Sequence, residues 1–156
     1  NILKVEMYKW RSSINKGYTL IELIIVIALL GLLSTLAVPS FKTTLANYKL
    51  EVAARELAQN IRLAQQKSIS EGESYKILLG ANNYQILLGR RGKLIKLPSE
   101  VSFEWTTYTE VNKTLSFNPS GAPNRGGTIA IMSGNNRLYV IVSVATGRVR
   151  VGNTPP

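Results

Sequence analysis

The feature that most constrains this fold is a basic segment that ends in a glycine and runs directly into a long uncharged stretch. Residues 16–22 read KGYTLIE, and no charged residue follows between Leu23 and Phe41. As one helix, a stretch of about 20 residues matches the ~30 Å hydrocarbon core of a bilayer. Glu22 therefore lies where an ionised side chain is costly, which indicates that its carboxylate has a dedicated partner.

The glycine precedes the apolar stretch, whereas the cleavage site of an ordinary secretory signal peptide follows it. Cleavage after Gly17 would remove a leader of residues 1–17, keep the apolar stretch on the mature chain, and make Tyr18 the new amino terminus. Lys9, Arg11 and Lys16 would hold the leader in the cytoplasm and send the C-terminal domain outward. Because residue 1 is Asn, we expect translation to start at Met7 or upstream.

The composition excludes several kinds of chemistry. The 156 residues include no Cys, no His and no Asp, so disulfides, thiolate or imidazole metal sites and Ser-His-Asp or Cys-His catalysis are excluded. Ser–Lys or paired-Glu chemistry remains open, but no spacing suggests either. We predict no catalytic residue, no metal and no cofactor. The net charge of +10 suits acidic partners such as nucleic acid or anionic lipid.

Helical periodicity changes character after the apolar stretch. Apolar or small residues recur at spacings of three and four on one face, at Leu50, Ala54, Leu57, Ile61, Ala64 and Ser68. We expect one long helix over about residues 19–71, stopped by Gly72. Its transmembrane half covers residues 18–41 and its amphipathic half residues 42–72. A coiled-coil seam is the alternative, but the short Ala-rich stripe favours packing on a sheet.

Residues 73–156 are predicted to form a β-rich domain. The expected strands are 75–79, 84–88, 93–97, 101–106, 115–117, 128–132, 138–145 and 148–151, separated by turn signals that include Arg91-Gly92. Such short connections imply antiparallel pairing, and the apolar 138–144 stretch is the candidate central strand. The aromatic residues Phe103, Trp105, Phe117 and Tyr139 are interpreted as core and edge packing rather than as a ligand cage. The predicted fold class is α+β, a long helix packed on an antiparallel β-sandwich-like domain.

The residues around Gly17 resemble the class III leader of type IV pilins and pseudopilins. The resemblance covers Gly17, residues 19–22, the apolar run, Gly31 and Pro39, while Tyr18 replaces the commoner Phe. It implies that a prepilin peptidase cuts after Gly17 and methylates the amino group of Tyr18. It also implies that the helix between the weak points Gly31 and Pro39 melts on polymerisation; kinks tolerated in any membrane helix are the alternative.

Glu22 has two interpretations. Thr19 and Glu22 have the spacing of a capping box, which satisfies backbone N–H groups at a helix start. The resemblance implies instead that Glu22 pairs with the terminal amine of Tyr18 on a neighbouring subunit. Both roles are compatible, and Gln separates them because it caps without carrying a charge.

The C-terminal part is similar to the GspH/FimT group of minor pilins. The segments that carry this likeness are residues 53–57, 62–65, 116–121 and 147–151, the last reading GRVRV. Members of that group serve type II secretion pseudopili or type IV pili. The resemblance implies a minor pilin or pseudopilin in the inner membrane, with prepilin peptidase and other pilins as partners, which then joins the filament.

Two basic clusters raise an alternative function, a FimT-like minor pilin that binds double-stranded DNA during natural transformation. Arg148 and Arg150 share one face of a strand, where two guanidinium groups suit successive phosphates. The second cluster lies at a predicted turn and contains Arg90, Arg91, Lys93 and Lys96. The alternative is that these charges have no ligand and only prevent another polypeptide from pairing with an exposed edge strand. A single-pass membrane protein that never polymerises is a further alternative.

Overall fold

The computed structural model describes residues 17–108 and 114–156, without the side chains of residues 36–40. The predicted leader up to Lys16, with Met7, Lys9 and Arg11, lies outside the described residues, and so does the side chain of Pro39. The chain divides into two units, one ending at Pro39 and the other covering Ser40–Pro156.

One long helix, α1 (Leu20–Glu71), forms as predicted. It begins after Thr19, whose Oγ1 accepts a hydrogen bond from the backbone N–H of Glu22 at 3.3 Å. That bond is the Thr half of a capping box. The helix continues through Gly31 and Pro39 without interruption. It stops at Gly72, whose φ of 68° is the left-handed conformation that ends many helices.

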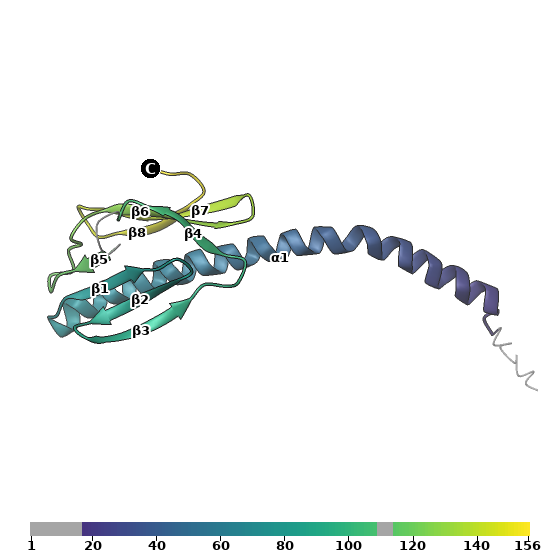
Figure 1. The fold of residues 1–156 in the computed structure, drawn as a ribbon, viewed down its shortest axis with the longest axis horizontal. Helices are drawn as coiled ribbons and strands as arrows, with labels where there is room; N and C mark the ends of the chain where they lie inside the picture. The colour runs from purple at the N-terminus through teal and green to yellow at the C-terminus, as the bar shows by residue number, and fades with distance from the viewer. Residues whose placement is uncertain (1–16, 109–113) are drawn as a thin grey trace, which may run out of the picture. The chain divides into compact units, whose positions relative to one another are not determined.

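Two antiparallel four-stranded sheets follow the helix (Figure 1). The first sheet has the order β3-β2-β1-β5, and its strands are β1 (Tyr75–Leu79), β2 (Asn83–Leu88), β3 (Arg91–Lys96) and β5 (Thr114–Phe117). The second has the order β4-β6-β7-β8, and its strands are β4 (Ser102–Thr106), β6 (Gly127–Ser133), β7 (Asn136–Val142) and β8 (Val149–Gly152). The predicted central strand is the interior strand β7.

Most strand ends differ from the prediction by one to three residues, and the differences at β3 and β7 move a turn. The expected Arg91-Gly92 turn is wrong, because both residues belong to β3, where Gly92 pairs with Leu87. The turn lies one step earlier, at Gly89, whose φ of 57° suits glycine. Strand β7 ends at Val142 rather than Ala145, since the chain turns back at Gly147, whose N–H bonds the carbonyl of Ser143.

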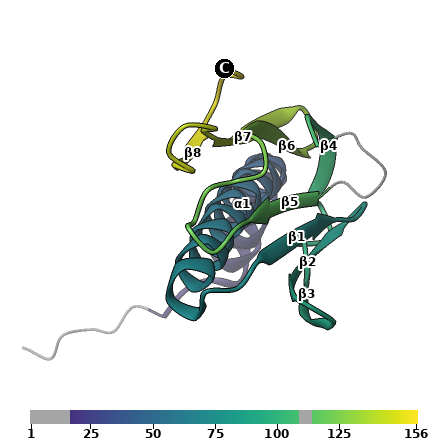
Figure 2. The ribbon, with the colours of Figure 1, turned by 90° about the vertical axis from the view of Figure 1, so that its left-hand side faces the viewer.

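The core of the second unit lies between α1 and the inner faces of both sheets, which wrap around one side of the helix (Figure 2). The six helix residues predicted to share the buried face are each at most 2% exposed. Opposite them lie residues such as Phe117, Ile129 and Val140, each 0% exposed. Since every member of this core cluster falls between Leu50 and Val149, the unit Ser40–Pro156 contains its whole core. The α+β fold class is confirmed.

Candidate functional site

The predicted cleavage site lies in exposed chain just before the helix. Gly17, Tyr18 and Thr19 are not helical, and the side chain of Tyr18 is 84% exposed. An extended, accessible segment is what a peptidase needs to place a peptide bond in its active site. The Glu22 side chain is also exposed, in the first turn of α1. The capping role predicted for Thr19 is present, and the carboxylate of Glu22 stays available to a partner.

The first part of α1 exposes apolar side chains on every side of the helix. Its large apolar residues from Leu20 to Leu33 are 48–78% exposed. A helix that is apolar all round is typically buried by other helices or by lipid. Within the described part of the chain, no helix has both the length and the apolarity needed to cross a membrane. The membrane-spanning role expected of residues 18–41 stays a prediction.

The two basic clusters lie on the edge strands of different sheets. Arg148 and Arg150 are exposed beside and within β8, while Val149 between them is only 3% exposed. This alternation places both arginine side chains on one face, as predicted. Arg90, Arg91, Lys93 and Lys96 are all exposed at the start of β3 and along it. The two clusters therefore lie on strands of different sheets and do not share one face of a sheet (Figure 2).

The sequence prediction missed a helix residue beside the second cluster. Lys67 of α1 lines a groove of about 320 Å³ together with Arg91 and Lys93. Its Nζ lies 5.9 Å from the centroid of the Tyr75 ring. The Tyr75 hydroxyl donates to Glu71 Oε2 at 2.6 Å, and this bond with the nearby carboxylate raises the pKa of Tyr75 to about 12. Glu71 thus offsets part of the positive charge on this side of the helix.

Three segments that carry the GspH/FimT resemblance meet beside the first cluster. Arg62 of α1 donates from Nη2 to the carbonyl of Val149 at 2.7 Å, and Gln65 Nε2 donates to the carbonyl of Gly121 at 2.9 Å. Gly147 packs so closely that a Cβ there would lie 2.2 Å from Gln65 Nε2. We call Arg62, Gln65, Gly121 and Gly147 the motif junction. It fixes the turn that presents Arg148.

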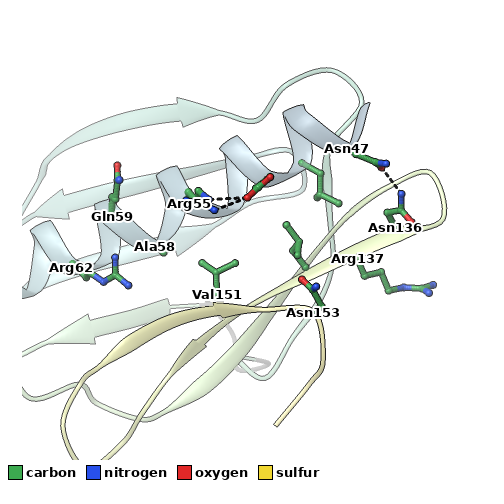
Figure 3. Close-up of a pocket in the computed structure, with 12 residues that line it drawn as sticks. Asn47, Arg55, Ala58, Gln59, Arg62, Asn136, Arg137, Val151 and Asn153 are labelled. Atoms are coloured by element: carbon green, nitrogen blue, oxygen red, sulfur yellow. Dashed lines mark hydrogen bonds and ion pairs between the residues drawn. The ribbon is translucent and has the colours of Figure 1, made fainter. Parts of the chain in front are cut away.

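A groove of about 770 Å³ runs between α1 and strands β7 and β8 (Figure 3). Ala58 of α1 and Val151 of β8 face one another across its apolar floor, and Arg62 lies at one end. Charges along the helix are paired, since Arg55 Nη2 lies 2.6 Å from Glu51 Oε1. Asn136 donates to Asn47 at the other end. The groove follows the free edge of β8, and among the described residues no group of acids could hold a metal ion.

Comparisons with known proteins agree with the fold and with the leader motif. Residues 12–38 match a family model described as the prokaryotic N-terminal methylation motif, and residues 53–147 match one described as type II transport protein GspH. The chain is 32% identical to competence protein ComGD of Bacillus subtilis (strain 168), over 87% of this chain and 92% of that protein. A match to the type IV major fimbrial protein FimA of Dichelobacter nodosus, 34% identical, covers only 40% of that protein.

Solved structures share the architecture at low sequence identity. The type IV minor pilin FimU of Pseudomonas aeruginosa aligns with a TM-score of 0.55 at 17% identity, over 68% of this chain and 90% of that one. The minor pseudopilin EpsH of Vibrio cholerae aligns with a TM-score of 0.57 at 13% identity, over 67% and 97%. The fold and leader motif define a pilin-like subunit. The chain belongs to the GspH family of minor pilins and pseudopilins.

Proposed function

We propose that this chain is a minor pilin of a filament that takes up DNA in natural transformation. The observation that carries the proposal is the likeness to competence protein ComGD, which spans 92% of that protein. The GspH match alone is equally compatible with a secretion pseudopilus. Deleting the gene in its own host should abolish transformation and leave protein secretion intact. Normal transformation with impaired secretion would contradict the proposal.

Processing after Gly17 is part of the same proposal. A prepilin peptidase cuts the bond between Gly17 and Tyr18 and methylates the new amino terminus. Support comes from the match of residues 12–38 to the N-terminal methylation motif and from the exposed, non-helical chain at this bond. Mass spectrometry of the protein from its host should find a chain that begins at methylated Tyr18. An intact leader in cells with active peptidase would argue against it.

Before assembly, the subunit is held in the cytoplasmic membrane by a single pass, with its β-domain outside the cytoplasm. The support is the uncharged stretch Leu23–Phe41, the basic residues before it, and the exposed apolar side chains of the first part of α1. In the filament, neighbouring subunits cover those side chains instead. Gly31 and Pro39 lower the cost of local unwinding there, by about 1 and 3 kcal/mol relative to Ala.

Glu22 sets the position of each subunit in the filament by pairing with the terminal amine of Tyr18 on its neighbour. The Thr19 hydroxyl already satisfies one backbone donor of the helix start, so the exposed carboxylate is available for this ion pair. In an apolar environment an isolated carboxylate is costly, so leaving Glu22 without its cation would be strongly unfavourable.

A second role, DNA binding, is favoured by the exposed arginines Arg148 and Arg150, with Arg90, Arg91, Lys93 and Lys96 on β3 as additional candidates. If these cations contact duplex phosphates, log affinity should fall against log salt with a slope of about −0.9 per contact. Gel shifts with residues 40–156 measure this slope. The absence of binding at low salt, or unchanged binding of the Arg148→Ala/Arg150→Ala variant, would exclude this role for the arginine pair.

A further inference from the structure

The sheet β4-β6-β7-β8 has one face toward α1 and an outer face away from it (Figure 2), and the strand register places an aromatic pair on the outer face. Trp105 of β4 and Tyr139 of β7 are the register partners of Ala130 on β6. Their ring centroids are 6.0 Å apart, with an interplanar angle of 49°. Ala130 is 0% exposed but does not belong to the core cluster, whereas its chain neighbours Ile129 and Ile131 do. Side chains alternate along a strand, so Ala130 points to the opposite face from them. The row Trp105–Ala130–Tyr139 therefore belongs to the face opposite the core.

Trp105 lies on the edge strand β4 and packs against Tyr139, but it is not a core residue. Its side chain is 41% exposed, whereas Phe117 is 0% exposed and Phe103 packs against the core. A β-bulge between Phe103 and Trp105 shifts the register. A bulge commonly re-aims a side chain. Here it lets Phe103 and Trp105, two residues apart, pair with partners on opposite faces of the sheet.

The arginine pair shares this outer face. Arg150 is paired with Ile141, two residues from Tyr139 on β7, so Arg150 and Tyr139 are diagonal neighbours about 7–8 Å apart. Arg148, exposed like Arg150, extends the same row beyond Ser143, whose N–H bonds the carbonyl of Arg148. The face thus presents two aromatic rings beside two guanidinium groups.

The electrostatics of this face suit a polyanion. Glu104 is the sole acidic residue in the four strands of the sheet. Arg137 neutralises it, with Nε at 2.8 and 2.7 Å from the two carboxylate oxygens. The second basic cluster differs, because Glu71 lies beside it and the Tyr75 ring there is only 6% exposed. An exposed ring next to unopposed arginines occurs on the β4-β6-β7-β8 face and not in that groove.

We propose that this outer face binds single-stranded DNA, with bases stacked on Trp105 and Tyr139 and phosphates on Arg148 and Arg150. The inference rests on the proposed DNA-uptake function and goes beyond the duplex contacts proposed for these arginines. In a duplex the faces of the bases are already stacked on one another, so exposed rings gain a base partner only where the strand is single. Stacking is tolerant of sequence because every base presents a π-face.

The test uses the unit Ser40–Pro156, which contains its whole core. The chain has two tryptophans, Trp10 and Trp105, so in this unit Trp105 is the single fluorescence reporter. The probe is an oligothymidylate of about 20 nucleotides, longer than the ~4–16 that one OB fold covers. Binding should quench Trp105 fluorescence. Anisotropy of labelled oligothymidylate then compares the variants, each checked for cooperative thermal unfolding.

Trp105→Ala should weaken binding of the oligothymidylate by about 5- to 150-fold, the loss expected for one stacked base. Trp105→Tyr, which keeps an aromatic face, should restore most of the affinity. Tyr48→Ala is the matched control, because it removes an aromatic side chain that is 64% exposed on α1. That variant should change the affinity by less than about twofold. Arg150→Ala should flatten the salt slope by about 0.7.

The outcomes distinguish two proposals, the DNA-binding role of the arginines and the stacking face, which is the outer sheet face proposed to bind single-stranded DNA. Quenching without an effect of Trp105→Ala, or equal losses for Trp105→Ala and Tyr48→Ala, would overturn the stacking face. Duplex binding that needs Arg148 and Arg150 but not Trp105 would overturn only this inference and leave the DNA-binding role standing. If neither oligothymidylate nor its duplex with oligoadenylate binds at low salt, both the DNA-binding role and the stacking face fail.

Discussion

Between Leu20 and Leu33, helix α1 leaves its large apolar side chains 48–78% exposed, whereas between Leu50 and Ser68 the same helix buries one face to 2% exposure or less. The difference follows from how apolar residues are distributed around the helix in its two halves. The first half is apolar all round, and the second has a single stripe that two sheets can cover. Removing the rest of that exposed surface from water is worth about 1 kcal/mol per large side chain. The rest of the chain does not bury the first half, and the proposed function assigns that burial to lipid or to other subunits.

The largest expected effect comes from removing one charge at the start of the exposed half. Glu22→Gln should leave the monomer folded and inserted in the membrane but abolish its incorporation into filaments, because Gln caps the helix without attracting the amine of Tyr18. Immunoblots of sheared filament fractions measure incorporation. Thr19→Val is the control, since it removes the hydroxyl that bonds the Glu22 N–H and keeps the carboxylate. Normal assembly of the Gln variant would favour capping alone.

A pair of equal truncations compares the two halves directly. Leu57→Ala, at a side chain that is 0% exposed, should lower the free energy of unfolding of the β-domain by about 2–5 kcal/mol. Leu29→Ala removes the same atoms from a side chain that is 55% exposed and should change that free energy by less than about 0.5 kcal/mol. Thermal unfolding of the full chain in detergent measures both. Similar losses would show that the first half also supports the domain.

Gly147→Ala tests the motif junction. The φ of 65° at Gly147 disfavours a side chain, and the new Cβ would lie 2.2 Å from Gln65 Nε2. We expect a loss of about 1–3 kcal/mol in unfolding free energy, measured by denaturant titration of residues 40–156. Gly134→Ala is a useful control, because its φ is also positive while no atom lies within 4 Å of its Cβ. Equal losses would mean that backbone strain, and not the contact with Gln65, sets the cost.

The smallest expected effect concerns a tyrosine of β2 that packs against the second half of α1, and it appears at alkaline pH. Burial raises the pKa of Tyr84 to about 12, and its hydroxyl accepts a hydrogen bond from Asn60 Nδ2 at 2.7 Å. In the unfolded chain a tyrosine ionises near pH 10. Stability is therefore fully present below pH 10 and falls as the pH rises toward 12. Tyr84→Phe should lose about 0.5–1.5 kcal/mol at pH 7 and show a weaker decline above pH 10, measured by urea unfolding.

Most of the fold could be predicted because the sequence carries strong local signals. Thr19 and Gly72 fix the ends of α1, and its buried stripe is read directly from the spacing of Leu50, Leu57 and Ile61. The turn at Gly89 was missed because Arg91-Gly92 is an equally good local turn signal. Only the pairing of Gly92 with Leu87 assigns those residues to β3.

The sites were predicted less completely, because they depend on contacts between distant segments. The alternation of Arg148, Val149 and Arg150 follows from strand periodicity alone. Strand periodicity does not predict that Lys67 lies beside Arg91, and it does not predict that Gln65 packs against Gly147. The exposure of Trp105 depends on a bulge in β4, and a strict period of two would not have separated it from Phe103. Such features appear only when the register of neighbouring strands is known.

Strands β3 and β8 each end a sheet without a neighbour on one side. An unpaired edge is a template on which another polypeptide can add as a further strand, and positive charges along it make that addition unfavourable between identical copies. Arg91 and Lys93 on β3 and Arg150 on β8 are exposed cations on such edges and therefore disfavour strand addition between copies of this chain. Replacing all of them with apolar residues would create aggregates whatever ligand they bind.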